Sequence, residues 1–190
     1  WIDQIIFIFD MSNNIAINGS IDALHSFIDY YEDFYQDYQQ GKLSGMDKAY
    51  VNRMIASKGE AAVTEILANK KFGIIFNRCQ QSREIANRLD QLREYLDTLD
   101  QYEKYKDRIH TVGMVPHHKI INITNNRGTL FYDKDRALSN CINRVAENII
   151  NENKFCPTLS NSNDEIIQFL QKNGKGGLLG NIKRIASSLG

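Results

Sequence analysis

Three apolar segments of the chain each end in polar residues of the kinds that bind ligands. The segments cover residues 5–9, 72–76 and 109–115, and the residues that follow them include Asp10, Asn77, Arg78, Pro116 and His117. In open α/β sheets, ligands bind outside the carboxyl ends of the strands. An asparagine amide offers a hydrogen-bond donor and an acceptor, and a guanidinium offers several donors and a flat face for stacking. The sequence therefore predicts a candidate binding site where these three segments end.

Each of these residues also has a purely structural explanation, which the sequence leaves open. Asn77 suits a turn or a helix cap, and Arg78 suits a solvated surface position. His117 and His118 are adjacent, and neighbouring side chains on an extended segment point in opposite directions, so they are poorly placed to share one metal ion. No G-x-S-x-G motif occurs, so nothing indicates a serine hydrolase.

The elements that would position these residues follow an α/β pattern. Continuous apolar runs are typical of strands buried on both faces, as in a parallel sheet covered by helices. Amphipathic segments predict helices over residues 20–40, 44–57, 60–69, 82–106, 137–152 and 165–172. Residues 13–19 are expected to form a turn, and residues 151–164 a linker or surface loop. We therefore expect an α/β fold with a mainly parallel sheet flanked by helices, in which all three strands are central.

Composition narrows the functional classes. The 190 residues include 23 basic and 23 acidic side chains, so the formal net charge of zero does not indicate nucleic-acid binding. The three cysteines lie far apart without a C-x-x-C spacing, which argues against a disulfide framework or a cysteine zinc site and favours a cytoplasmic location. No apolar run approaches the roughly 20 residues of a membrane-spanning helix.

The order of these segments resembles the C-terminal half of the ParA/MinD-type ATPases, deviant P-loop ATPases that position plasmids, division sites and flagella. The matching pieces are Gly73-Ile-Ile-Phe-Asn-Arg78, Thr111-Val-Gly-Met-Val-Pro116 and the helix over residues 137–150. The opening strand resembles the family strand that follows switch II, and residues 15–27 resemble the helix after it. The resemblance covers residues 1–152.

The resemblance implies an adenine nucleotide as the ligand, namely ATP with magnesium. In the family, the asparagine of the Asn-Arg pair reads the adenine edge, and the backbone after the proline-ended strand helps to wall the base. Carried over, Asn77 would read the base, Arg78 would stack on it or order the loop, and Pro116 and His117 would line the pocket. The resemblance also implies a homodimer that forms with nucleotide and positions or regulates cargo.

One part of the family pattern is missing from this sequence. The phosphate-binding motif G-x-x-x-x-G-K-S/T does not occur, so this chain alone is not expected to hydrolyse ATP. A buried strand as the opening element suggests the C-terminal part of something longer. The alternative is a non-enzymatic α/β interaction or adaptor domain that binds a protein partner.

Two segments indicate partners. We expect an ATPase-like domain over residues 1–152, and a linker with a C-terminal helical extension over residues 153–190. The helix over residues 20–40 carries more aromatic residues than one buried stripe needs, which points to core packing or to a dimer or partner face. These residues are Phe27, Tyr30, Tyr31, Phe34, Tyr35 and Tyr38. Residues 178–189 are basic and amphipathic, which is typical of a helix peripheral at the membrane or docked on its own domain.

If residues 178–189 bind a membrane surface, the chain should co-sediment with liposomes in proportion to their anionic lipid, and less so at high salt. The physical reason is that Lys183 and Arg184 meet the lipid charge while the apolar side enters the headgroup boundary. A chain without residues 176–190 should stay in the supernatant. Equal sedimentation of both forms would contradict the membrane interpretation.

Overall fold

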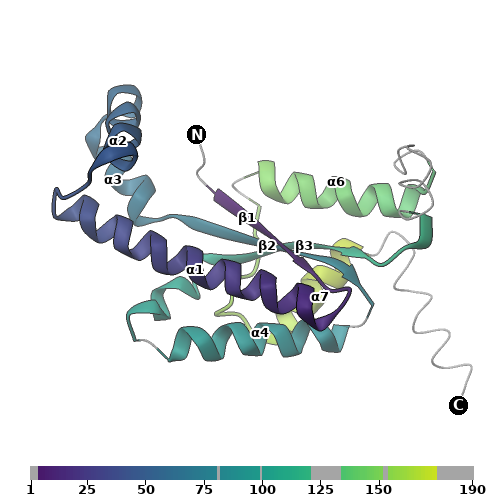
Figure 1. The fold of residues 1–190 in the computed structure, drawn as a ribbon. Helices are drawn as coiled ribbons and strands as arrows, with labels where there is room; N and C mark the ends of the chain where they lie inside the picture. The colour runs from purple at the N-terminus through teal and green to yellow at the C-terminus, as the bar shows by residue number, and fades with distance from the viewer. Residues whose placement is uncertain (1–3, 81, 99, 121–133, 152–153, 175–190) are drawn as a thin grey trace, which may run out of the picture.

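The chain folds as a parallel sheet with helices on both faces (Figure 1). The computed structural model describes residues 4–80, 82–98, 100–120, 134–151 and 154–174. In chain order the elements are β1 (Gln4–Asp10), α1 (Asn14–Gln39), α2 (Gly45–Lys58), α3 (Glu60–Ala68), β2 (Lys71–Cys79), α4 (Ser82–Asp97), the 3-10 helix η1 (Asp100–Tyr105), β3 (Ile109–Pro116), α6 (Arg136–Ile150) and α7 (Asn163–Gly174). The predicted α/β fold with a mainly parallel sheet flanked by helices is confirmed.

β2 lies at the centre of the sheet, between β1 and β3. Gln4 pairs with Lys71 and Asp10 with Asn77, so β1 and β2 run side by side over the whole length of β1. β3 pairs in parallel on the other side of β2, and its own outer side carries one antiparallel bridge, between His110 and Thr158. The prediction that all three strands are central is therefore wrong for the described sheet, in which only β2 has a parallel strand on each side.

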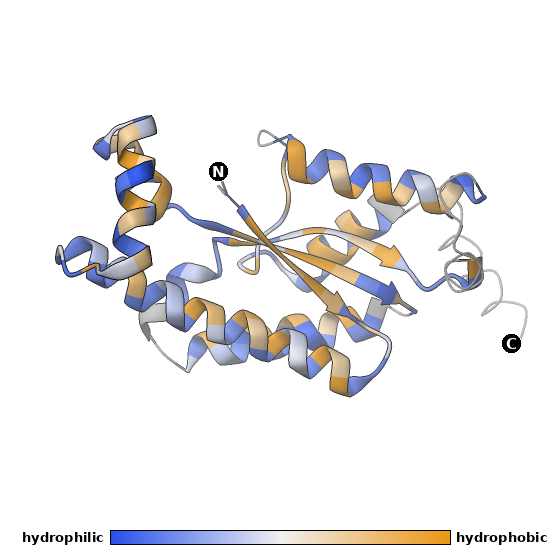
Figure 2. Ribbon diagram, turned by 45° about the horizontal axis from the view of Figure 1, so that its top comes forward, coloured by the Kyte–Doolittle hydropathy of each residue, from blue (hydrophilic) through white to orange (hydrophobic). Residues whose placement is uncertain are grey.

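The helices divide between the two faces of the sheet. α1, α4, η1 and α7 enclose the larger core on one face, and α6 covers the other face over β3 (Figure 1). Figure 2 shows that the strands are apolar along their middle and polar at their ends. Gly113 lets α6 approach closely, because a β-carbon there would lie 2.6 Å from Val145 Cγ2. The larger core includes Phe9, Leu24, Ile28, Val63, Phe72, Ile74, Phe76, Ile85, Leu89, Leu92, Leu96, Tyr105, Ile109, Ile166 and Leu170.

The outer side of β1 is less protected than the rest of the sheet. The Met11 amide donates to the Asn77 carbonyl (2.8 Å), so the odd-numbered residues of β1 direct their main-chain groups toward β2 and the even-numbered residues direct theirs outward. Within the described ranges, no strand pairs with this outer side. Ile8 is 60% exposed, although charged residues are the usual protection of a sheet edge.

α1 begins earlier than the sequence predicts. Residues 13–19 were expected as a turn because they are rich in asparagine and end in Gly19, but the helix already starts at Asn14. Asn13 is its N-cap, with a side-chain oxygen that accepts the Ala16 amide (2.9 Å). Burial of Ile17 in the core also stabilises this part of the helix. Together with the cap it outweighs the loss of helix stability that Gly19 causes.

The helix predicted over residues 82–106 is broken in two. α4 ends at Asp97, and η1 follows from Asp100 to Tyr105. A single helix of that length would extend about 37 Å in one direction. The break instead turns the chain back toward the sheet, where the Tyr105 ring packs edge-on against Phe72 with 5.8 Å between centroids.

The segment expected as a linker or surface loop pairs with the sheet. The Thr111 amide and hydroxyl both donate to the Pro157 carbonyl (2.8 and 2.9 Å). Arg93 of α4 donates to the carbonyls of Leu159 (2.8 Å) and Asn161 (2.7 Å). Leu159 and the inner side of α7 are buried in the same core as the strands. The division at residue 152 stays a prediction, with residues 154–174 packed on the sheet.

A buried carboxylate links α1 to η1. Glu32 accepts hydrogen bonds from the Tyr105 hydroxyl (2.5 Å) and from Lys104 Nζ (3.0 Å). Burial acts to raise the pKa of the Glu32 carboxyl, but the hydrogen bonds from Tyr105 and Lys104 outweigh it, so the pKa lies below its usual value of 4.5. Glu32 therefore stabilises the fold in its ionised form.

Replacing Glu32 with Gln should lower the free energy of unfolding at pH 7 by about 1–3 kcal/mol, because two charge-assisted hydrogen bonds are lost in a buried place. The contribution of Glu32 is present above the ordinary pKa of a glutamate and is lost as the pH falls through the lowered folded value. The difference between the two proteins in urea unfolding should therefore shrink below about pH 4.

Asp33→Asn is the matched control, since Asp33 is the exposed neighbour on the same helix. It should change the free energy of unfolding by less than about 0.5 kcal/mol. Equal effects of the two substitutions would contradict a specific role for Glu32.

Candidate functional site

The carboxyl ends of the three strands meet at one edge of the sheet. In the register of the sheet, Asn77 lies between Asp10 and Val115, and Cys79 lies beside Pro116. The His117 amide donates to the Cys79 carbonyl (3.0 Å), which ties the end of β3 to the end of β2. All four residues predicted from the sequence, Asn77, Arg78, Pro116 and His117, are therefore brought to this edge.

These four residues differ in exposure. Pro116 is buried, Asn77 is half-buried, and Arg78 and His117 are exposed. The Asn77 main-chain carbonyl is used by Met11, whereas its side-chain amide makes no hydrogen bond with any residue that the structure describes. Alternation along β2 puts this amide on the same face of the sheet as Ile75, the face that α6 covers over β3. Val115, the partner of Asn77 on β3, also packs on that face, whereas Pro116 follows it on the opposite face, the side of Met114 and Cys79.

Arg78 has a strained main chain. It is the extra residue of a β-bulge, because Asn77 pairs with Val115 and Cys79 already pairs with Pro116. Its φ of 59° is in the left-handed region, where no other non-glycine residue of the described ranges lies. Such a conformation costs an L-residue about 1–2 kcal/mol. Strain of this kind collects at functional sites, so the bulge supports a role for Arg78 beyond that of a surface charge.

The Arg78 side chain reaches across to β1. Its Nη1 lies 3.5 Å from Asp10 Oδ2, and both side chains are partly exposed, so this ion pair adds little stability. The other carboxylate oxygen of Asp10 accepts the Ser12 amide (3.0 Å) and so begins the turn into α1. Asp10 thereby connects Arg78 to the turn that precedes α1.

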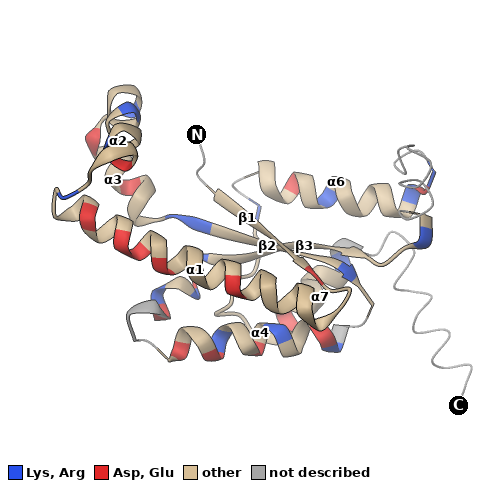
Figure 3. Ribbon diagram, viewed as in Figure 1, with Lys and Arg blue, Asp and Glu red and all other residues tan. Residues whose placement is uncertain are grey.

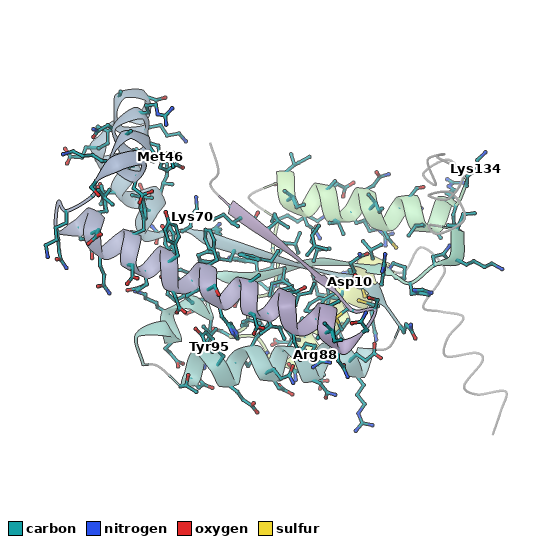
Figure 4. All side chains as sticks on the ribbon, viewed as in Figure 1. Asp10, Met46, Lys70, Arg88, Tyr95 and Lys134 are labelled. Carbon is teal, nitrogen blue, oxygen red and sulfur yellow. The ribbon has the colours of Figure 1, made fainter. Side chains whose placement is uncertain are left out.

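Arg88 of α4 lies beside this edge and contacts the start of α1. Figure 4 shows Asp10 at the end of β1 and Arg88 on α4, beneath the start of α1. Arg88 Nη2 donates to Asn14 Oδ1 (2.8 Å). Sequence reasoning named Asp10 and Asn14 only as part of a strand exit, and it missed Arg88. Asp10 was detectable because it directly follows a strand, whereas no local pattern indicates that Arg88 faces Asn14.

The residues at this edge suit the base of the implied nucleotide, but they do not suit its phosphates or magnesium. The described residues contain no group of three His, Cys, Asp or Glu side chains placed to hold a metal ion. Burial, assisted by the charge of Glu84, raises the pKa of the Cys79 thiol to about 12, which disfavours the nucleophilic thiolate form. The amide and guanidinium of Asn77 and Arg78 suit a planar polar ring, but these residues do not fit magnesium or a triphosphate.

A scan with protein-family models and searches of curated proteins and of solved structures find no match to this chain. In the described part, no helix is both long and apolar enough to cross a membrane. The predicted membrane-binding segment, residues 178–189, lies outside the described residues, and so does most of the segment between β3 and α6. The ParA/MinD resemblance thus continues to rest on the motifs and their order.

The strain at Arg78 can be measured by comparing Arg78→Gly with Arg78→Ala. Both substitutions remove the ion pair with Asp10, and they differ only in the β-carbon, which is disfavoured at positive φ. After allowance for the greater freedom of glycine in the unfolded chain, the Gly protein should have the higher free energy of unfolding, by about 0.5–1 kcal/mol.

The same pair of substitutions at Arg53, inside α2, is the control. There the order should reverse, with Gly less stable than Ala by about 1 kcal/mol. If Gly is the less stable residue at both positions, position 78 is not strained.

Proposed function

We propose that this chain is part of a ParA/MinD-like ATPase and that the carboxyl edge of its sheet binds the adenine end of ATP. The observation that carries the proposal is the side-chain amide of Asn77. It is half-buried, lacks a hydrogen-bond partner among the described residues and lies between Asp10 and the end of β3. These are the properties expected of an amide that binds a ligand through one donor and one acceptor of that ligand.

The chemistry of adenine agrees with this edge. The base presents an amino donor beside a ring-nitrogen acceptor, and one asparagine amide can bind both. Val115, which pairs with Asn77 on the same face, offers an apolar surface for the flat base, the main chain after Pro116 would wall it, and the Arg78 guanidinium can stack on it. His117, which is exposed, would line the rim. A base held in this way is selected by shape and by the pattern of its polar edge.

The proposal assigns only the adenine end to these residues. The phosphates and magnesium would be held by a P-loop portion of the complete protein, which this sequence does not contain. As in the family it resembles, the complete protein would form a homodimer with nucleotide and use it as a switch to position or regulate cargo. ATP hydrolysis belongs to that complete protein.

An observation also favours the second candidate, a non-enzymatic α/β interaction domain. Ile8 is exposed on a strand whose outer side has no partner strand in the described ranges. Apolar residues exposed on a sheet edge mark contact sites for other proteins. This candidate accounts for the missing P-loop, but it does not account for the Asn77 amide, which has no partner among the described residues, or for the strain at Arg78.

Replacing Asn77 with Ala separates the two functions. With a fluorescent ATP analogue and the full-length protein, the affinity should fall by about 1–3 kcal/mol, which is about 5- to 150-fold in Kd. The reason is that a polar group of the base is left buried without a partner. Asn52→Ala, at an exposed position of α2, is the matched control and should leave the affinity unchanged.

A full-length protein that binds neither ATP nor ADP would contradict the ATPase proposal and support the interaction domain. If the Asn77→Ala and Asn52→Ala proteins bind nucleotide equally strongly, the protein has a nucleotide site, but that site does not lie at this edge.

A further inference from the structure

Three side chains form a row across the carboxyl edge of the sheet. Asn77 pairs with Asp10 of β1 on one side and with Val115 of β3 on the other. The smaller core, on the face that α6 covers over β3, includes Val115 together with Ile6 and Ile75. By alternation along β1 and β2, Asp10 and Asn77 turn their side chains to that face too. We call Asp10, Asn77 and Val115 the edge row.

The edge row changes in chemistry from one strand to the next. It begins with the carboxylate of Asp10, continues with the amide of Asn77 and ends with the apolar side chain of Val115. Neighbouring strands lie about 4.8 Å apart, so one flat ligand can touch all three side chains. A ligand on Asn77 therefore meets an acceptor on one flank and an apolar surface on the other.

Asp10 is the only charged residue of β1, and it stands at the end of the strand. Figure 3 shows that the charged residues of the strands lie near their ends. Asp10 Oδ1 accepts the Ser12 amide (3.0 Å), and Oδ2 lies 3.5 Å from Arg78 Nη1. Each carboxylate oxygen can accept more than one hydrogen bond, and the side chain is 34% exposed. Asp10 is thus held from two sides and can still accept a hydrogen bond from a ligand.

An adenine bound by Asn77 has one N–H bond left over. Its amino group carries two of them, and the Asn77 amide accepts one while it donates to the adjacent ring nitrogen. The second N–H needs an acceptor beside Asn77. In the edge row Asp10 is that acceptor, and Val115 offers its apolar surface to the ring. This arrangement orients the base with its amino group toward β1 and its ring toward β3.

We infer that Asp10 is a specificity-determining residue, which accepts the second N–H of the adenine amino group and rejects purines that carry an oxygen at that position. This role rests on the proposed function and adds the selection of the base to it. An oxygen there would bring one hydrogen-bond acceptor against another, with no proton between them. GTP and inosine triphosphate (ITP) carry such an oxygen, so both should bind more weakly than ATP.

Replacing Asp10 with Asn tests this role. The new amide keeps an oxygen for the Ser12 amide, but its nitrogen can donate to the oxygen of ITP. In competition with a fluorescent ATP analogue on the full-length protein, the wild type should bind ATP at least about tenfold more tightly than ITP. In the Asp10→Asn protein this preference should shrink to about threefold or less, because ITP gains a hydrogen bond and ATP loses one.

Asp37→Asn is the matched control. It removes the same charge from an exposed position in the last turns of α1, whereas the carboxyl edge lies at the start of that helix. Its preference for ATP over ITP should equal that of the wild type. Both nucleotides are measured on the same sample of each protein, so a partly unfolded sample leaves the ratio of the two Kd values unchanged.

Two results would overturn the role of Asp10 and leave the proposed function intact. One is a wild type that binds ATP and ITP equally well. The other is a preference for ATP that is as strong in the Asp10→Asn protein as in the wild type, which would leave Asp10 with the turn before α1 as its only role. A full-length protein that binds no nucleotide would overturn the proposed function and the role of Asp10 together.

Discussion

The parallel pairing of β2 on both of its sides is the constraint on which this fold depends. A strand with neighbours on both sides and helices on both faces can carry polar side chains only at its ends, and β2 has apolar or glycine residues from Phe72 to Phe76. Parallel neighbours also require long crossovers, which α1, α2 and α3 supply before β2, and α4 with η1 after it. The same pairing places Asn77 and Arg78 between the ends of β1 and β3.

The candidate site lies at the start of α1, and α2 and α3 lie at its other end. α1 starts at the carboxyl edge, where Asn13 caps it and Asn14 binds Arg88, and its last turns approach α2 and α3. Its inner face is buried along the length of β1 and β2, and Glu32 fixes it to η1. α1 is thus held at its start by its cap and by Arg88, and further along by Glu32.

Sequence reasoning predicted what depends on local pattern and on the general geometry of parallel sheets. Continuous apolar runs identified the strands, and the common edge of parallel strands brought Asn77 near Pro116. Prediction from the sequence failed where residues far along the chain determine the local structure. The turn expected at residues 13–19 is helical because Ile17 reaches the core, and the helix expected to run to residue 106 breaks because Tyr105 packs on Phe72. Nothing in the sequence indicated the left-handed main chain of Arg78, since glycine is the residue usually found in that conformation.

The register of the sheet also determines the order in which the chain can assemble. Phe72 pairs with Ile109 across a single helical connection, whereas Gln4 pairs with Lys71 only after the whole of α1, α2 and α3 has been made. Closing the longer connection costs more chain entropy, and contacts between distant residues slow folding. The unit of β2, α4 and β3 is therefore able to form first. We therefore expect β1, the earliest strand of this sequence, to pair last, and until then its apolar residues would be open to pairing with other unfolded chains.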